Sequence, residues 1–323
     1  MPNFTHFQYV AYRTPTLRSH AAAAYKPDTQ SKVGQGLDPA AQALVQRFAA
    51  VLTRAKGLGT IDARATTLKV FVAPEFYFKG PDPNEVAPYG SFSINSMTNI
   101  LEALKGIGAP GPDWIVFAGS VVFYLPEKLP AYKHADGSPL SDKESVYANV
   151  APVITQGALT YVLKHEVSSI DGPPPSRAAS KSDIYRPLVD NWTEQKARFI
   201  TVGNRTIGLE VCLDHHTSEL GRAINAYPAN ESGRAPPAID IHLVTACGMS
   251  LKTPKSRDNG YVLLCDGIRW GTDYGSQANK VLNSGCADWL RPQIDVLPAS
   301  LTVVNPQTAP QQSIAVYPAQ PLP

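Results

Sequence analysis

Three apolar runs in this sequence each end in a side chain that can take part in acyl chemistry. VFVAPE ends in Glu75, LTYVLK ends in Lys164, and GLEVC ends in Cys212. Catalytic groups of layered α/β folds gather at the carboxyl ends of strands, so these distant residues can share one pocket. There the carboxylate would take the thiol proton, the thiolate would attack a carbonyl or nitrile carbon, and the ammonium would stabilise the oxyanion.

The segment around Cys212 has the layout of a nucleophile at a strand-to-helix junction. Residues 206–211 form a β-rich apolar run that is entered through a Gly203–Asn204 turn. Residues 214–218 then supply capping side chains, and Glu219 favours the first turn of a helix. A helix start favours the thiolate form, which is the reactive one. A lone Cys at a strand end is more often an apolar filler, so the functional interpretation depends on its partners.

The elements expected around these residues indicate a layered α/β fold in which strands and helices alternate. Asp38 and Pro39 predict a helix start, and apolar residues then recur at helical spacing until Gly57. A second helix is expected at 94–105, ending at Gly106. The expected strands are 4–12, 68–73, 114–125, 206–211, 238–246 and 261–264, with a hairpin of 146–155 and 158–163.

In order and in context, the three segments resemble the nitrilase, or carbon–nitrogen hydrolase, superfamily. APEFYF around Glu75, YVLKHE around Lys164 and GLEVCLD around Cys212 are similar to the surroundings of its Glu-Lys-Cys triad. The later segment AIDIHLVTACG looks like the one that follows the nucleophile in that family. The resemblance extends over residues 68–266, and each motif is weak alone but stronger in this order.

The resemblance implies a single-domain, four-layer α-β-β-α sandwich without metal or organic cofactor. It implies that Glu75 is the general base, that Cys212 forms a thioester, and that Lys164 and the backbone N–H of Leu213 form the oxyanion hole. Leu213–Asp214 resembles amidase-like branches, which favours a small amide as substrate over a nitrile. Members usually assemble through helix contacts, so a homo-oligomer is expected.

Some residues depart from the family pattern or have weaker assignments. The second glutamate of the family would correspond to Glu166 or Glu194, and the basic residue to Lys164 or else to Lys181 or Lys196. Asp214 is a possible supporting residue beside Glu166. We expect the pocket to be lined by Phe76, Tyr77, Trp192, His215 and His216. The equally weighted alternative is that the aromatic residues among them belong to the hydrophobic core.

Two alternatives use other residues. A metal site could be built on Asp214, His215 and His242, but adjacent histidines lack the i, i+4 spacing of a helical ligand pair, so we expect no metal. Cys265 is a rival nucleophile without a clear helix start, and Cys247 and Cys286 are expected to be structural or incidental thiols.

Composition restricts the classes of protein and partner. With 29 basic and 27 acidic residues and no basic stripe, the chain is not expected to bind nucleic acid or membranes. The beginning of the sequence lacks the pattern of a signal peptide, and four cysteines without zinc spacing favour a reduced, cytoplasmic protein. We expect one hydrolase domain at 1–291 and a proline-rich tail at 292–323 that packs on the domain or on a neighbouring subunit. The roles of residues 13–36 and of the proline-rich segment 166–196 stay open.

The sequence thus predicts a cysteine-dependent carbon–nitrogen hydrolase that cleaves a small amide. Acyl transfer or nitrile hydrolysis on the same triad is an alternative that the sequence does not separate from amide hydrolysis. A catalytically silent relative that serves as a binding or assembly module is another.

Overall fold

A computed structural model describes residues 2–16, 27–80, 90–125, 146–166, 192–270, 273–301 and 312–323. Residues 17–26 and 167–191, which include Lys181, lie outside this part of the chain. The described elements form a mixed α/β structure, which confirms the predicted class.

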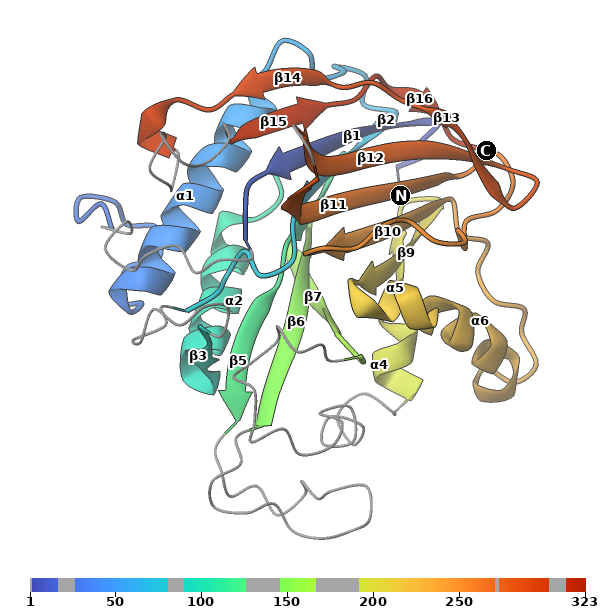
Figure 1. Cartoon of the computed structure of the whole chain (residues 1–323), viewed down its shortest axis with the longest axis horizontal. Helices are drawn as coiled ribbons and strands as arrows, with labels where there is room; N and C mark the ends of the chain where they lie inside the picture. Colours follow the sequence, from blue (N-terminus) through green and yellow to red (C-terminus); the bar gives the residue numbers. More distant parts are fainter. Residues whose placement is uncertain are drawn as a thin grey trace, which may run out of the picture.

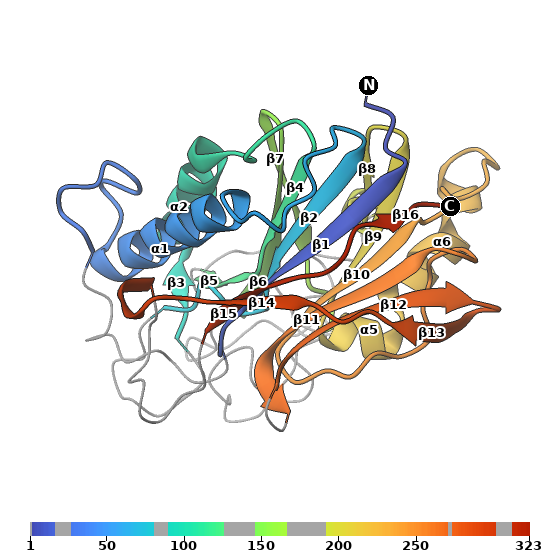
Figure 2. The ribbon, with the colours of Figure 1, turned by 90° about the horizontal axis from the view of Figure 1, so that it is seen from above.

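Two β-sheets form the centre of the molecule (Figures 1 and 2). Among the described residues, the larger sheet has ten strands and the smaller has six. The larger follows the order β14 (Gln293–Val296), β15 (Ser313–Val316), β1 (His6–Arg13), β2 (Thr67–Ala73), β4 (Trp114–Ala118), β6 (Val146–Thr155), β5 (Val121–Leu125) and β3 (Phe92–Ser93). In addition, β16 (Gln320–Pro321) pairs with β1, and β7 (Ala158–Leu163) pairs with β6. The smaller follows the order β13 (Gly285–Trp289), β12 (Asp273–Leu282), β11 (Tyr261–Trp270), β10 (Ile241–Ala246), β9 (Arg205–Val211) and β8 (Phe199–Val202).

One hydrophobic core is shared by the two sheets. Side chains alternate along a strand, so Phe7, Tyr9 and Ala11 of β1 face this core, whereas Val10 and Tyr12 face the opposite side. The shared core includes β2 and β4 of the larger sheet and β9, β10 and β11 of the smaller one. Phe7 packs against Tyr261, with 4.5 Å between ring centroids. The sheets therefore lie face to face.

Two helices cover the other face of the larger sheet (Figure 2). Helix α1 (Pro39–Lys56) begins where the side chain of Asp38 accepts a hydrogen bond from the backbone N–H of Ala41, and it ends at Gly57. Helix α2 (Ile94–Ile107) is capped in the same way by Ser93. The apolar stripe of α1 packs on the sheet, where Phe48 meets Phe71 edge-on.

Three further helices lie near the smaller sheet: α4 (Trp192–Lys196), α5 (Leu213–Thr217) and α6 (Glu219–Asn230). Buried Leu220 of α6 packs so closely on Gly208 of β9 that a Cβ atom there would lie 2.5 Å from its methyl carbon. A short 3-10 helix, η2 (Ala299–Leu301), contacts α1. Within the described ranges, no helix has both the length and the apolar character needed to span a membrane.

The expected strand at 114–125 is wrong in one respect, because it is two strands. Gly119 separates β4 from β5 with φ 79°, and a Cβ atom at this position would lie 2.4 Å from the carbonyl oxygen of Pro74. Glycine alone fits such a position, and the break lets β5 pair with β3 and β6, whereas β4 pairs with β2 and β6.

The described parts of the C-terminal segment belong to the larger sheet. β15 pairs antiparallel with β1, and β14 pairs antiparallel with β15. Tyr317 stacks on Tyr9 of β1, with 4.9 Å between ring centroids. Strands from the two ends of the described chain therefore lie side by side in one sheet.

Candidate active site

The parallel strands of both sheets end in one region of the molecule. β1, β2 and β4 run parallel, as do β9, β10 and β11. The hydroxyl of Thr245, near the end of β10, donates to the carbonyl oxygen of Ala73 at the end of β2, with 3.0 Å between the oxygens. The backbone N–H of Cys212 donates in turn to the carbonyl oxygen of Thr245 at 2.9 Å. These two bonds connect the segment before Glu75 to Cys212.

Glu75 and Lys164 form a buried ion pair. The Nζ atom of Lys164 lies 2.8 Å from Oε1 of Glu75, and both side chains have 0% exposure. Asn149 of β6 binds both partners. Its side-chain amide donates to Oε1 of Glu75 at 3.0 Å, and its backbone carbonyl oxygen accepts from the backbone N–H of Lys164 at 2.9 Å. Asn149 was not predicted, although an amide side chain within the apolar strand VYANVAPVIT is the signal that could have identified it.

Phe76 determines where the residues after Glu75 lie. Its φ is 62°, and its backbone N–H donates to the hydroxyl of Ser120 at 2.9 Å. Its fully buried ring lies 5.6 Å from the Nζ atom of Lys164, within range of a cation–π contact. The next residue, Tyr77, packs in the core beneath α1 against Tyr12 and Phe48. The structure thus places Phe76 beside Lys164 and Tyr77 in the core.

Cys212 occupies a sharp turn between β9 and α5. Its φ is 48° and its ψ is −106°, a conformation that L-residues rarely adopt. The thiol-bearing residue is 5% exposed, and its carbonyl oxygen accepts from the N–H of His215 at 2.9 Å. Strained turns of this kind are typical of nucleophiles that are presented at a strand end.

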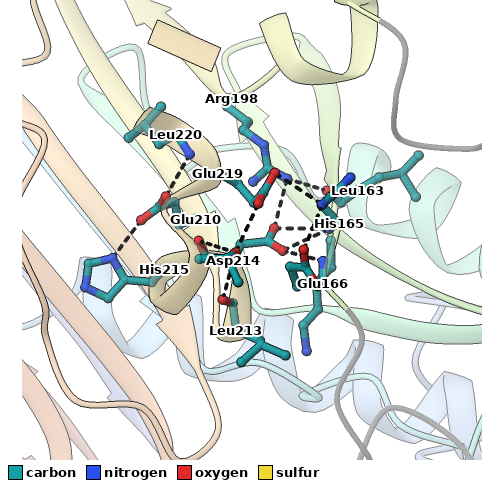
Figure 3. Close-up of polar contacts among 12 residues, drawn as sticks. Leu163, His165, Glu166, Arg198, Glu210, Leu213, Asp214, His215, Glu219 and Leu220 are labelled. Atoms are coloured by element: carbon teal, nitrogen blue, oxygen red, sulfur yellow. Dashed lines mark hydrogen bonds and ion pairs between the residues drawn. The ribbon is translucent and has the colours of Figure 1, made fainter. Parts of the chain in front are cut away.

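Asp214 attaches the Cys212 turn to the segment that follows Lys164 (Figure 3). Its fully buried carboxylate accepts hydrogen bonds from the N–H groups of His165 at 3.0 Å and Glu166 at 2.7 Å. Arg198 lies 2.9 Å from the same carboxylate. Burial raises the pKa of Asp214, while Arg198 and the N–H of Glu166 act to lower it.

A second buried carboxylate, Glu210, lies two residues before Cys212. Its Oε1 atom accepts from the N–H of Leu220 at 2.7 Å, and its Oε2 atom lies 2.6 Å from Nδ1 of His215 and 2.9 Å from Nε2 of His242. The other ring nitrogens accept backbone N–H groups: that of Lys252 at His215 and that of Lys255 at His242.

This network assigns His215 a role other than the substrate contact that we expected. Both of its ring nitrogens are bonded within the protein, and it is 3% exposed. His242 lies with His215 and Glu210, whereas Asp214 belongs to the other network. In both His215 and His242, one ring nitrogen accepts a backbone N–H, so the other ring nitrogen carries the proton and donates to Glu210. Hydrogen bonds therefore account for all four ring nitrogens.

A second group of possible metal ligands lies beside Asp214 and consists of His165, Glu166 and Glu219. Nδ1 of His165 lies 3.2 Å from Glu219 and 3.5 Å from Glu166. Arg222 lies 2.6 Å from Glu219. Ion pairing therefore accounts for these carboxylates, as it does for many groups of this composition.

The other expected site residues lie in different surroundings. Trp192 packs edge-on against Tyr227 of α6, and its Nε1–H donates to Glu231 at 2.6 Å. Lys196 pairs with the same Glu231 at 2.9 Å, so it does not replace Lys164. Glu194 is partly buried, and burial raises its pKa.

His216 contributes to the wall of a cavity of about 840 Å³. Glu75, Lys164 and Cys212 do not line it, but its wall includes Met249 and Leu264, which pack in one apolar cluster with Cys212. The cavity therefore lies next to the apolar cluster that contains Cys212.

Cys265, the rival nucleophile, is held as a thiol. It is buried between the sheets, and its Sγ atom lies 3.6 Å from the carbonyl oxygen of Tyr12 and 3.5 Å from that of Val72. Burial raises the pKa of Cys265, and Asp266 raises it further. Burial also raises the pKa of Cys247. Such thiols are poor nucleophiles.

No family model matches the chain, and no curated protein matches it. Among solved structures, it is similar to glutamine-dependent NAD+ synthetase from Acinetobacter baumannii in complex with adenosine diphosphate, with 12% sequence identity and a TM-score of 0.42. The match covers 95% of this chain and 48% of that chain, so this chain spans about half the length of that protein. A likeness at this level assigns no activity.

Proposed function

We propose that this chain is a cysteine-dependent carbon–nitrogen hydrolase with a nitrilase-like α-β-β-α sandwich, and that Glu75, Lys164 and Cys212 act as its triad. The observation that carries the proposal is the fully buried Glu75–Lys164 pair at the strand ends where the strained Cys212 turn is attached. The face-to-face sheets, with helices near both, support the sandwich.

In the first half of the proposed reaction, Glu75 accepts the proton of the Cys212 thiol, and the sulfur attacks the amide carbon. The negative charge on the carbonyl oxygen is stabilised by the Lys164 ammonium and the N–H of Leu213. The C–N bond then breaks, and the leaving amine takes the proton from Glu75, which leaves a thioester on Cys212.

In the second half, a water molecule gives a proton to Glu75 and attacks the thioester carbon. The C–S bond breaks, the carboxylic acid leaves, and the sulfur recovers the proton from Glu75. Glu75 returns to the carboxylate form after each half, so the buried Lys164 ammonium regains its charged partner.

An amide is favoured over a nitrile by Leu213–Asp214, which resembles the amidase-like branches of the nitrilase superfamily. Asp214 here binds the N–H groups of His165 and Glu166, so it fixes the segment next to Lys164 relative to Cys212. We assign Asp214 a positioning role on this basis.

The test is mass spectrometry of the protein after acid quenching in the presence of a panel of small amides. The wild-type chain is expected to carry an acyl mass on Cys212 and to release the amine or ammonia. Cys212→Ala and Cys212→Ser should lose both while keeping the fold, whereas Cys286→Ser, at an exposed thiol, should keep both. Full turnover by Cys212→Ala would end the hypothesis.

A further inference from the structure

The cavity beside the Cys212 turn has a wall built from several separate segments. Arg13 enters it from the end of β1, Leu264 and Ser276 from the central strands of the smaller sheet, and Arg291 from the segment before β14. Residues 248–250 and Lys252, which follow β10, form another side. Its volume of about 840 Å³ lies within the range of small-molecule sites.

The charges in this wall have one sign. Arg13, Lys252 and Arg291 line the cavity, and the described lining contains neither Asp nor Glu. Arg13 is 8% exposed, so its charge lies in a poorly solvated part of the wall. Within the described ranges, Lys252 and Arg291 form no ion pair with a carboxylate. The positive charges of Lys252 and Arg291 are thus available to a ligand.

Two acidic residues that bind the segments around the cavity, Asp266 and Glu210, are engaged by other groups of the protein. Both carboxylate oxygens of Asp266 accept hydrogen bonds from backbone N–H groups, those of Gly248 and Met249, and so hold the segment that follows β10. Glu210 is enclosed by His215, His242 and Leu220. Neither carboxylate lines the cavity.

The same contacts connect the cavity to the proposed nucleophile. The N–H of Lys252 donates to Nε2 of His215 at 2.7 Å, which joins the cavity loop to α5 three residues after Cys212. Met249 and Leu264 have one side in the cavity wall and pack with Cys212. A ligand in the cavity would therefore lie next to the thiol segment and would present its anionic end to the basic residues.

We propose that this cavity binds the anionic end of the substrate, and that the substrate is an amide with a carboxylate at the far end of its acyl chain. This inference rests on the proposed function, because it takes Cys212 as the nucleophile. Ser276 and Gln277 add neutral hydrogen-bonding groups to the wall, so the site can orient a carboxylate as well as attract it.

The first test compares alkylation of Cys212 by iodoacetate, which is an anion, with alkylation by neutral iodoacetamide. Peptide mass spectrometry follows Cys212 and, in the same sample, the exposed Cys286. The variants are Lys252→Gln, Arg291→Gln and the double variant, and the control is Lys105→Gln on the exposed surface of α2. The side chains of Lys105, Lys252 and Arg291 are all exposed, and none belongs to the proposed triad.

At low salt the ratio of the iodoacetate rate to the iodoacetamide rate at Cys212 should fall about threefold for each charge removed, and roughly tenfold in the double variant. The ratio at Cys286 and in Lys105→Gln should stay unchanged. Because salt screens such charges, 0.5 M salt should reduce the differences. Equal ratios in all variants would overturn the anionic-substrate inference and leave the proposed nucleophile intact.

The second test uses turnover. Monoamides of dicarboxylic acids with two to five methylene groups are compared with neutral amides of equal length, by kcat/KM. The carboxylate series should be preferred about tenfold or more, and Lys252→Gln/Arg291→Gln should remove that preference by lowering kcat/KM for the carboxylate series. Preference for neutral amides overturns the inference alone. A Cys212 that reacts with neither alkylating reagent and forms no acyl adduct overturns the proposed function as well.

Discussion

The Nζ atom of Lys164 lies 2.8 Å from Oε1 of Glu75, and neither side chain has exposed surface. A buried pair of this kind is weak evidence for a gain in stability, because desolvation opposes the Coulomb attraction. The removal of one partner is different, since it leaves an uncompensated charge in the interior. The proposed triad therefore accounts for the pair better than a gain in stability does.

We expect Lys164→Met and Glu75→Gln each to lower the free energy of unfolding by about 3–5 kcal/mol. The double variant Glu75→Gln/Lys164→Met should be more stable than either single variant, because it buries no unpaired charge. Urea unfolding measures all three, and each should lack amide turnover. The Arg54–Asp295 pair is the control, since its side chains are 37% and 25% exposed and either one stays in contact with water when the other is removed. Additive effects in the Glu75–Lys164 cycle would show that the two residues do not interact.

The backbone conformation of Cys212 predicts which of two inactive variants at this position is the more stable. With φ 48° and ψ −106°, any residue with a Cβ atom is strained here, and glycine is not. Cys212→Gly should therefore be more stable than Cys212→Ala by about 1 kcal/mol, although both variants are inactive. The control is Ala246→Gly in β10, where the same loss of a methyl group should lower stability. If Cys212→Gly is the less stable of the two inactive variants, the turn is not strained.

Asp214 allows a test of positioning. Asp214→Asn keeps one acceptor for the N–H groups of His165 and Glu166 but loses the charge that faces Arg198. We expect kcat to fall about ten- to hundredfold with a smaller change in KM, because Lys164 and Cys212 lose their fixed relation. Asp62→Asn removes a carboxylate that pairs with Arg64 before the start of β2, at the other end of this strand from Glu75, and should keep kcat. A larger effect on KM than on kcat would argue for a direct substrate contact instead.

Local signals in the sequence were sufficient for several elements. The Asp38–Pro39 start of α1 is observed, and the hairpin of β6 and β7 turns at Gln156–Gly157 as predicted. The run before Cys212 becomes β9, followed by α5. In each case the deciding residues lie within a few positions of one another, so short-range pattern was enough.

Long-range contacts were not readable in the same way. Phe76 adopts φ 62° without being glycine, and Tyr77 after it lies in the core. Glu210 of β9 forms hydrogen bonds with His215 and with His242 of β10. The contact with His242 joins separate strands, and no local spacing in the sequence indicates it. Asn149 likewise reaches Glu75 from a neighbouring strand.

The Glu210 network makes stability depend on pH. Burial lowers the pKa of His242 below its ordinary value of 6.5, although the hydrogen bond to Glu210 opposes this. Burial alone would raise the pKa of Glu210, but the bonds from His215 and His242 outweigh it and hold the pKa well below 4.5. Below about pH 6.5 the unfolded chain thus binds more protons than the folded one, and stability falls as the pH drops.

The free energy of unfolding, measured in urea at pH 7, 6 and 5, should therefore decrease toward pH 5. In His242→Gln the side-chain amide can still donate to Glu210 but does not titrate, so the decrease should be smaller by about 1 kcal/mol. His6→Gln, at a histidine near the surface that contacts Thr5, should keep the wild-type slope. Identical slopes in wild type and His242→Gln would mean that His242 has the same proton affinity in both states, and that the network does not hold it neutral.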